Sequence, residues 1–350
     1  MLAAVMDPAD KATLDQGRNN NFNLIRILAA TGVLISHAFP LSLGPGADDP
    51  FSAWLGGTSL GTICVLVFFA ISGYFITKSF DQRRSVPAFL RARALRLFPA
   101  LIVVTLVSVI VAGLFLTSAS PAEFWPAALT FVLRDVTLFH LQNNLPGVFI
   151  ANPYGPAING SLWTLGHEVT AYLCVLLAGW SHILGRNQVF WLGTAAFLVL
   201  YGWKVELPLK GRFEELCYLG LPFLFGAILY RWRGVIRLSA PIALILIFTA
   251  TLARETGLFS PVLALTLAYV TIWLGFLPTA ILGQYNRLGD YSYGTYLYAF
   301  PVQQLGASLG FVTPGSNMLF ALPIALCCAA VSWHCIEGPA LRLRHKRPTP

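Results

Sequence analysis

The chain consists mainly of apolar runs that are long enough to cross a bilayer, separated by short polar connectors. A transmembrane α-helix needs about 20 mostly apolar residues, and it satisfies its own backbone hydrogen bonds. Only 11% of the 350 residues are charged, whereas soluble domains have about 25%. The pattern therefore predicts an all-α, polytopic membrane protein.

The apolar runs and the basic connectors together predict about ten transmembrane helices, with both termini in the cytoplasm. The expected spans are residues 22–40, 60–78, 97–117, 161–182, 188–203, 214–230, 238–254, 258–277, 289–310 and 317–337. In this arrangement every strongly basic connector lies on the cytoplasmic side, as the positive-inside rule requires.

One further apolar stretch, residues 124–140, is predicted not to cross the membrane. It carries an arginine and an aspartate near its middle, where charge is costly. If it did cross, the basic connectors at 78–96 and 231–237 would lie on opposite sides of the membrane. We therefore expect an extracytoplasmic loop over 118–160, with one short helix that lies on the surface or re-enters the membrane.

The remaining composition fits one membrane domain, residues 21–340, with cytoplasmic tails over 1–20 and 341–350, the second of them basic. The net charge of +8 is concentrated at the ends of apolar runs, which is typical of topology-setting loops and gives no reason to expect nucleic-acid binding. All six cysteines lie in predicted spans without metal-ligand spacing, so we expect no metal site.

The first span carries two ionisable side chains, Arg26 and His37. Their separation is close to three helical turns, so both project from one face, about 16 Å apart along the axis. Ionisable groups inside a span usually face a pathway or a site. The predicted topology puts Arg26 near the cytoplasmic end and His37 near the outer end.

The fourth span places a carboxylate, Glu168, at a depth comparable with that of His37. Its helical face also carries Ser161, Thr164 and Tyr172. A histidine with a carboxylate as its orienting partner can act as a general base toward a hydroxyl. The alternative is a buried hydrogen-bonded pair that only holds helices together.

A second group of candidates consists of basic side chains on the cytoplasmic side. Arg93 and Arg96 lie one helical turn apart where the third span enters the membrane, and Lys78 ends the second span. Guanidinium groups bind phosphate oxygens well, so a phosphate-bearing donor such as a coenzyme A thioester could dock there. The alternatives are topology-setting charge and contact with anionic lipid headgroups.

Two further segments near the C-terminus carry polar groups. The run 289–301 is rich in aromatic residues and includes Asp290, Ser292 and Tyr293, which suits either a site or an interfacial aromatic belt. Glu337 ends the last span, where it could pair with a nearby arginine.

Six motifs in this order resemble acyltransferase family 3, the integral-membrane O-acyltransferases of bacterial envelopes. They are Arg26-x10-His37, Phe68-Phe-Ala-Ile-Ser72-Gly73-Tyr74, Arg93-x-x-Arg96-x-x-Pro99, Ser161-Leu-Trp163-Thr-Leu-Gly-His-Glu168, Ser292-Tyr293-Gly-Thr-Tyr296-Leu297 and Ile336-Glu337-x-Pro339. The resemblance covers roughly residues 20–340.

The resemblance implies an enzyme of the bacterial inner membrane. It would transfer an acyl group, usually acetyl from acetyl-CoA, to a hydroxyl of an envelope or exported carbohydrate, with no metal. Its partners would be the carbohydrate acceptor, which can be lipid-linked, and the bilayer. The route can be direct or can pass through an acyl-enzyme, with His37 as the acylated residue.

The same resemblance implies roles for individual residues. His37 would be the catalytic histidine, Arg26 its essential partner and Glu168 part of the outer active-site wall. Arg93 and Arg96, with Lys78, would form the acyl-donor site. The remaining motif residues would support the acceptor side: Ser72, Ser161, Trp163, Tyr293 and Glu337.

One departure and two rival functions remain. Many family members carry a histidine soon after the Tyr-Leu of the fifth motif, whereas this chain has Tyr298-Ala-Phe-Pro301.

A transporter or flippase of a lipid-linked saccharide could use Arg26, His37 and Glu168 to bind cargo, but it has less need of a diarginine pair facing the cytoplasm. A non-catalytic scaffold would leave the buried Arg26 and His37 unexplained.

Overall fold

The computed structural model describes residues 20–83, 85–180, 187–203, 211–278, 285–286 and 288–345. The predicted N-terminal tail, apart from Asn20, and the last five residues of the predicted C-terminal tail lie outside these ranges.

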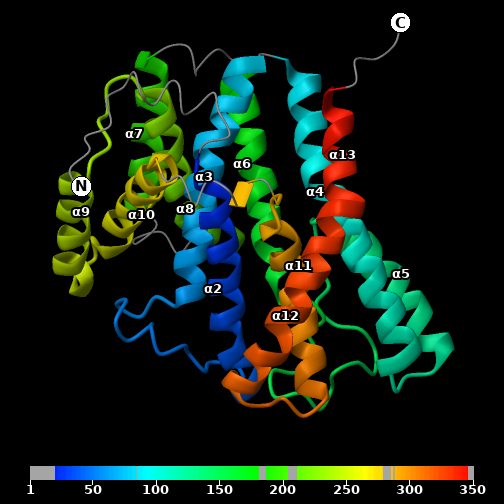
Figure 1. Cartoon of the computed structure of the whole chain (residues 1–350). Helices are drawn as coiled ribbons and strands as arrows, with labels where there is room; N and C mark the ends of the chain where they lie inside the picture. Colours follow the sequence, from blue (N-terminus) through cyan, green and yellow to red (C-terminus); the bar gives the residue numbers. More distant parts are fainter. Residues whose placement is uncertain are drawn as a thin grey trace, which may run out of the picture. The chain divides into compact units, whose positions relative to one another are not determined.

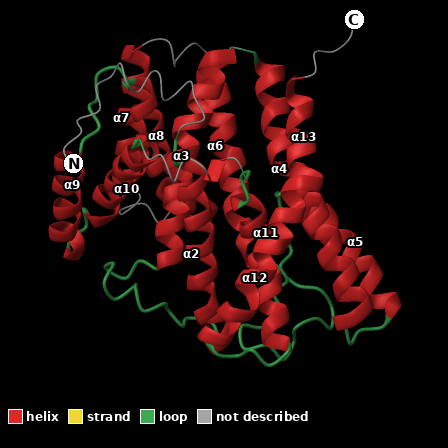
Figure 2. Cartoon of the chain, in the orientation of Figure 1, coloured by secondary structure: helices red, strands yellow, loops and turns green. Residues whose placement is uncertain are grey.

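Helices account for nearly all regular structure in these ranges, and the one β-type contact there is an isolated bridge between Asn144 and Ala157 (Figures 1 and 2). The α-helices are α2 (Phe22–Leu43), α3 (Leu60–Arg83), α4 (Val86–Val111), α5 (Pro121–Thr137), α6 (Trp163–Trp180), α7 (Asn187–Trp203), α8 (Arg212–Arg231), α9 (Ala240–Leu252), α10 (Phe259–Phe276), α11 (Ser292–Ser308), α12 (Pro314–Ser332) and α13 (Gly338–Arg342). Short 3-10 and π-helical turns extend several of them: η1 (Ala112–Leu116), η2 (Gly160–Leu162), η4 (Ala253–Glu255), η6 (Trp333–Glu337) and η7 (Leu343–His345).

Seven helical segments within the described residues are long and apolar enough to cross a membrane. They are α2, α3, α4 with η1, η2 with α6, α8, α10, and α12 continued through η6 and α13. The predicted all-α, multi-pass membrane protein is thus confirmed. The helices α7, α9 and α11 cover three further predicted spans but have only 17, 13 and 17 residues, so the count of ten and the orientation stay predictions.

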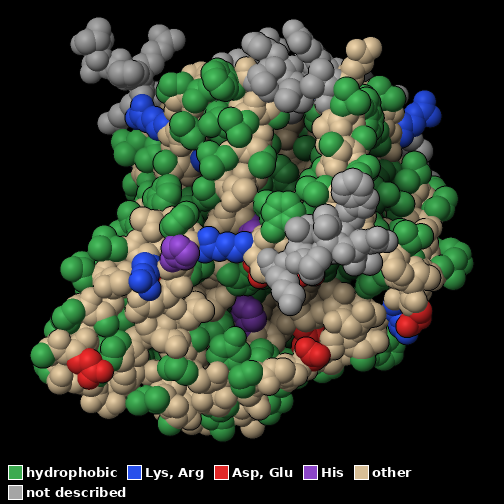
Figure 3. Space-filling view, turned by 180° about the vertical axis from the view of Figure 1, so that it is seen from behind, with side chains coloured by type: hydrophobic (Ala, Val, Ile, Leu, Met, Phe, Trp, Pro, Cys, Tyr) green, Lys and Arg blue, Asp and Glu red, His purple; other side chains and the backbone are tan. Residues whose placement is uncertain are grey.

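The surface of the helices carries large apolar side chains, as expected of a protein in contact with lipid. Along α4 and η1 the exposed residues include Val107, Ile110 and Phe115, the last of these 77% exposed. Figure 3 shows apolar side chains spread over the face that it presents.

The chain divides into two compact units, which we describe separately. Unit 1 comprises residues 1–25, 65–90 and 167–288. Its apolar core includes Ile71, Leu229 and Ile272, from α3, α8 and α10. On α3, a Cβ atom at Gly73 would lie 1.9 Å from the backbone oxygen of Phe223 on α8. Glycine at this position therefore allows two helix backbones to touch, which is the usual close packing of membrane helices.

Unit 2 comprises residues 26–64, 91–166 and 289–350. Buried amides join three of its helices. The side-chain nitrogen of Gln303 on α11 donates to the Leu34 oxygen on α2 at 2.9 Å and to Asn317 Oδ1 on α12 at 3.1 Å. Because a polar group left unsatisfied in a membrane is costly, these bonds fix the register of the three helices.

The short helix predicted in the loop 118–160 is present as α5, and it is not among the seven candidate spans. Ser120 caps its N-terminus by accepting a hydrogen bond from the Glu123 backbone. The following loop is tied to the helix, because Asp135 Oδ1 accepts from the Gln142 backbone at 2.9 Å. The side of the membrane on which this loop lies stays a prediction.

Asp135 gives α5 a pH-dependent stability. Burial raises the pKa of its carboxyl to about 7, and the hydrogen bond from Gln142 opposes this only in part. The folded state therefore holds the proton more tightly than the unfolded chain, and stability falls as pH rises from about 4 through about 7. Asp135→Asn keeps an oxygen acceptor for Gln142 and should remove this fall.

The measurement is the unfolding temperature in detergent between pH 5 and 8, for the wild type, Asp135→Asn and Glu123→Gln. Glu123 is exposed on the same helix, so its substitution should leave the pH trend of the wild type unchanged. A parallel trend for the wild type and Asp135→Asn would show that Asp135 is not the titrating group.

Candidate active site

His37 lies on α2 in unit 2, partly buried and packed against an aromatic ring. Its imidazole meets the Phe300 ring of α11 edge to face, with centroids 5.6 Å apart. Its Nδ1 atom is buried and makes no hydrogen bond to any of the described residues. The lone pair or proton on this nitrogen is thus available to a ligand.

The segment that opens α6 is fixed on α11 beside the same phenylalanine. The side-chain nitrogen of Asn159 donates to the backbone carbonyl oxygen of Leu297 at 3.0 Å. The Tyr296 hydroxyl donates to the backbone carbonyl oxygen of Ser161 at 2.8 Å. A Cβ atom at Gly160 would lie 2.7 Å from the Phe300 ring, so the backbone can approach the ring this closely only at a glycine.

Ser161 supplies a second buried polar atom without a partner in the part of the chain that the structure describes. The residue is 1% exposed, and its Oγ makes no hydrogen bond there. Buried polar groups in proteins are nearly always hydrogen-bonded. Ser161 Oγ and His37 Nδ1 are two of several such exceptions among the described residues, and they occur in segments that both contact Phe300, so a polar ligand could bond to both.

A second polar cluster lies at the other end of α2 and is ionic. Asp290, just before α11, accepts from Arg96 Nη2 at 2.6 Å and from Arg26 Nη1 at 3.5 Å, both at Oδ2. Its other oxygen accepts from the Ser292 hydroxyl at 2.5 Å. One carboxylate therefore holds arginines from α2 and α4, while each arginine side chain keeps more than a fifth of its surface exposed.

Arg96 extends this cluster toward the C-terminus. Its Nη1 lies 3.5 Å from Glu337 Oε2, and Glu337 also accepts from the Ser332 hydroxyl at 2.9 Å. The expected pairing of Glu337 with an arginine is therefore confirmed. The guanidinium also lies over the Tyr293 ring, 5.4 Å from its centroid.

Arg26 and His37 are not direct partners. Each belongs to a different cluster, and their separation of 11 positions amounts to about 16 Å along the helix. Arg93 lies one turn before Arg96 on α4 and is half-buried, and Trp163 opens α6 with 41% of its surface exposed.

Glu168 and Ser72 lie together in unit 1. Glu168 Oε1 accepts from the Ser72 hydroxyl at 3.1 Å and from the Tyr172 hydroxyl at 2.5 Å. The spacing rule that put Glu168 and Tyr172 on one helical face thus holds. Lys78 of α3 also belongs to unit 1, where its amine lies 5.8 Å from the Phe75 ring centroid. The predicted pairing of Glu168 with His37 stays a prediction.

Two residues of the clusters were given no role on the basis of the sequence. Asp290 stood out only as a polar group in an aromatic run, and Phe300 only as part of the segment that replaces a family histidine. An acidic residue next to the start of an apolar helix was a usable signal for Asp290, because it needs a cationic partner. Nothing in the sequence signals the contact of Phe300 with His37.

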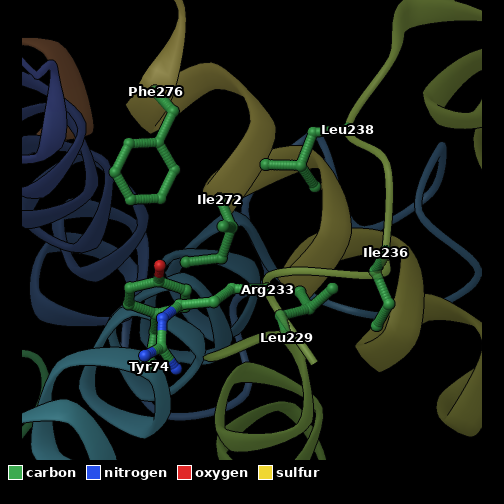
Figure 4. Close-up of a pocket in the computed structure, with 7 residues that line it drawn as sticks. All are labelled: Tyr74, Leu229, Arg233, Ile236, Leu238, Ile272 and Phe276. Atoms are coloured by element: carbon green, nitrogen blue, oxygen red, sulfur yellow. The ribbon is translucent and has the colours of Figure 1, made fainter. Parts of the chain in front are cut away.

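Unit 1 also contains a small cavity, shown in Figure 4, with a volume of about 10 Å³. Such a volume is at the lower limit for one water molecule, so the cavity cannot take a substrate. It is lined by Tyr74, Leu229, Arg233, Ile236, Leu238, Ile272 and Phe276. Among the described residues no group of histidine, cysteine and acidic side chains could hold a metal ion.

Comparison with known proteins identifies the family of the chain. A family model described as an acyltransferase domain matches residues 19–336. An O-acetyl transferase of Shigella phage Sf6 is 28% identical, over 91% of this chain and 95% of its own length. Nodulation protein 10 of Rhizobium leguminosarum bv. viciae is 29% identical, over 94% and 95%. Acyltransferase MdmB of Streptomyces mycarofaciens is 26% identical, over 85% of both. No solved structure matches significantly.

The ionic cluster predicts a large effect of Asp290→Asn. Removing this charge leaves Arg26 and Arg96 close together, and Glu337 is then the one remaining carboxylate of the described cluster. Removing one partner of a buried ion pair lowers the free energy of unfolding by about 3 kcal/mol. The unfolding temperature in detergent should therefore fall clearly. Asp48→Asn, an exposed change in the loop after α2, is the control and should have no effect. Equal stability of Asp290→Asn and the wild type would contradict a structural role for the cluster.

Proposed function

Because the chain belongs to the acyltransferase family whose model matches residues 19–336, we propose that it is a membrane O-acyltransferase that uses an acyl-CoA donor and a carbohydrate acceptor. The acyl group is in the first instance acetyl, as the name of the Shigella phage relative suggests. The observation that carries the proposal is the pair of unbonded atoms, His37 Nδ1 and the Ser161 hydroxyl, in two segments that both contact Phe300.

His37 acts as the general base in this proposal. One ring nitrogen takes the proton of the acceptor hydroxyl while the hydroxyl oxygen bonds to the thioester carbonyl carbon. The carbon–sulfur bond then breaks, and the thiolate of coenzyme A takes the proton from the imidazolium. Ser161 supports the acceptor side by hydrogen bonding to the incoming hydroxyl.

The arginine cluster forms the donor site in this proposal. Arg93 and Arg96 bind the phosphates of the donor. The Arg96 side chain is partly exposed, so its guanidinium can exchange a carboxylate contact for a phosphate oxygen. Arg26 acts through its shared contact with Asp290, which holds it at the donor end of α2.

The acyl group must then travel along α2. The two clusters lie about 16 Å apart on this helix, so the thioester arm of the donor reaches from the arginines to His37. Under the predicted topology the phosphates stay on the cytoplasmic side of the bacterial inner membrane, and the acceptor meets the acyl group near the outer side. Glu168, Ser72, Trp163, Tyr293 and Glu337 have supporting roles.

His37→Ala should abolish acyl transfer without lowering the amount of protein in the membrane. The measurement uses vesicles with acetyl-CoA labelled in its acetyl group and follows label in an envelope glycan. His334→Ala is the control, because this exposed histidine bonds to Tyr291 and lies outside both clusters. Transfer retained in His37→Ala would remove His37 from catalysis.

The same vesicles test the rival function. Absence of label with the wild type, together with saccharide movement that depends on Arg26 and His37, would overturn the enzyme proposal in favour of a transporter.

Arg96→Lys should weaken donor use although it keeps the charge. A lysine cannot present the planar fork that meets both a carboxylate and a phosphate, so the KM for the acyl donor should rise about tenfold. The kcat should change much less. Arg91→Lys is the control, because Arg91 is exposed on the same helix and bonds to a backbone oxygen. An unchanged donor KM in Arg96→Lys would leave topology or structure as its role.

A further inference from the structure

The C-terminal end of α5 borders an open groove of about 670 Å³ that the site described above does not use. Its walls are partly polar and partly apolar: Thr130, Leu133, Arg134, Thr137, Phe139, His140 and Leu141. The Thr137 hydroxyl is directed to backbone oxygens of its own helix. Arg134 and His140 therefore supply the cationic and hydrogen-bonding groups for a ligand.

The helix beside the groove is apolar on two faces. Phe124, Ala128 and Phe131 are buried in unit 2, whereas Leu129 and Leu133 are 63% and 60% exposed. An exposed apolar stripe on a membrane protein is covered by lipid. Leu133 also lines the groove, so the groove borders this exposed apolar stripe.

Arg134 is the charge that selects the ligand. It is exposed, and the described residues include no acidic partner for it. A guanidinium in this position binds phosphate oxygens. The adjoining lipid-covered stripe favours a phosphate that carries an apolar tail over a soluble phosphate.

The groove and the candidate active site both lie in unit 2. The buried Asp135 next to Arg134 packs into the interior of the unit with Asn159 and Leu162, with no space for a ligand between them. The loop that leaves the groove pairs with the segment before Asn159, because the Ile158 backbone donates to the Asn143 oxygen at 2.6 Å. This loop is therefore tied directly to the segment that leads to Ser161.

From these contacts we infer that the groove at Arg134 and His140 binds the phosphate of a lipid-linked saccharide acceptor and so positions the saccharide for acylation. This inference rests on the proposed function, since it names the form in which the acceptor arrives. The lipid tail would lie along the exposed stripe of α5, and the phosphate would remain at its C-terminal end.

The test measures binding to the full-length chain in nanodiscs of phosphatidylcholine, with a labelled long-chain isoprenyl phosphate as the probe. Arg134→Gln should weaken binding about tenfold, as expected for the loss of one charge-assisted contact. Arg134→Lys should bind nearly as the wild type does, because a monophosphate accepts a point charge. The matched control is Arg254→Gln, an exposed arginine on η4 in the other unit.

Three competitors identify the source of the phosphate. The isoprenyl alcohol should compete poorly because it lacks the phosphate, and inorganic phosphate should compete poorly because it lacks the apolar tail. Phosphatidylglycerol should compete less well than the isoprenyl phosphate. Equal competition by phosphatidylglycerol would show a general anionic-lipid site, and equal competition by inorganic phosphate would show a site for soluble anions. Unchanged binding in Arg134→Gln would also overturn the inference.

The binding assay involves no acyl transfer, so its outcome is separate from that of the transfer experiment. His37→Ala should bind the isoprenyl phosphate as the wild type does. Loss of binding in Arg134→Gln together with absence of transfer by the wild type would contradict the proposed function while leaving the phosphate site in place.

Discussion

A carboxylate shared by two arginines holds much of unit 2 in place. In lipid the hydrophobic effect does not draw helices together, so packing and polar contacts must do so. Asp290 meets this need by accepting from Arg26 of α2 and Arg96 of α4 at the start of α11. Arg96 then reaches Glu337 at the end of the last long helical segment. Four helical segments thus meet at one small set of charges.

This arrangement places structure and function on the same side chains. Arg96, which is proposed to bind the donor phosphates, also holds the helices, so donor binding must exchange one anion for another. The partial exposure of the Arg96 side chain makes such an exchange possible. At the other end of α2, in contrast, His37 and Ser161 have polar atoms that the described protein does not satisfy. At the arginine end the positive charges are paired with carboxylates of the protein, whereas at the histidine end two polar atoms remain unbonded within the described residues.

The sequence was informative where a residue's surroundings follow from its own helix. The long apolar runs predicted the helical membrane fold, the cost of charge inside a span singled out Arg26 and His37, and periodicity put Glu168 on one face with Tyr172. Contacts between distant segments could not be predicted in this way. The pairing of Arg26 with Asp290 joins residues 264 positions apart, and the packing of Phe300 on His37 depends on how α11 lies against α2. The end of a helix is also not fixed by its apolar run, since α9 covers only Ala240–Leu252 of the run 238–254.

The amides that join α2, α11 and α12 have a consequence for how the acyl group can travel. Because Gln303 is bonded to both Leu34 and Asn317, sliding α2 along α11 would break the buried hydrogen bond to Leu34. The distance between the arginine end and the histidine end is itself fixed, because both ends belong to the one helix α2, and α2 acts as a ruler for the donor. Under the proposed roles, the length of the donor then decides whether it can react. A donor with too short an arm would bind to the arginines through its phosphates, but its carbonyl carbon would not reach His37.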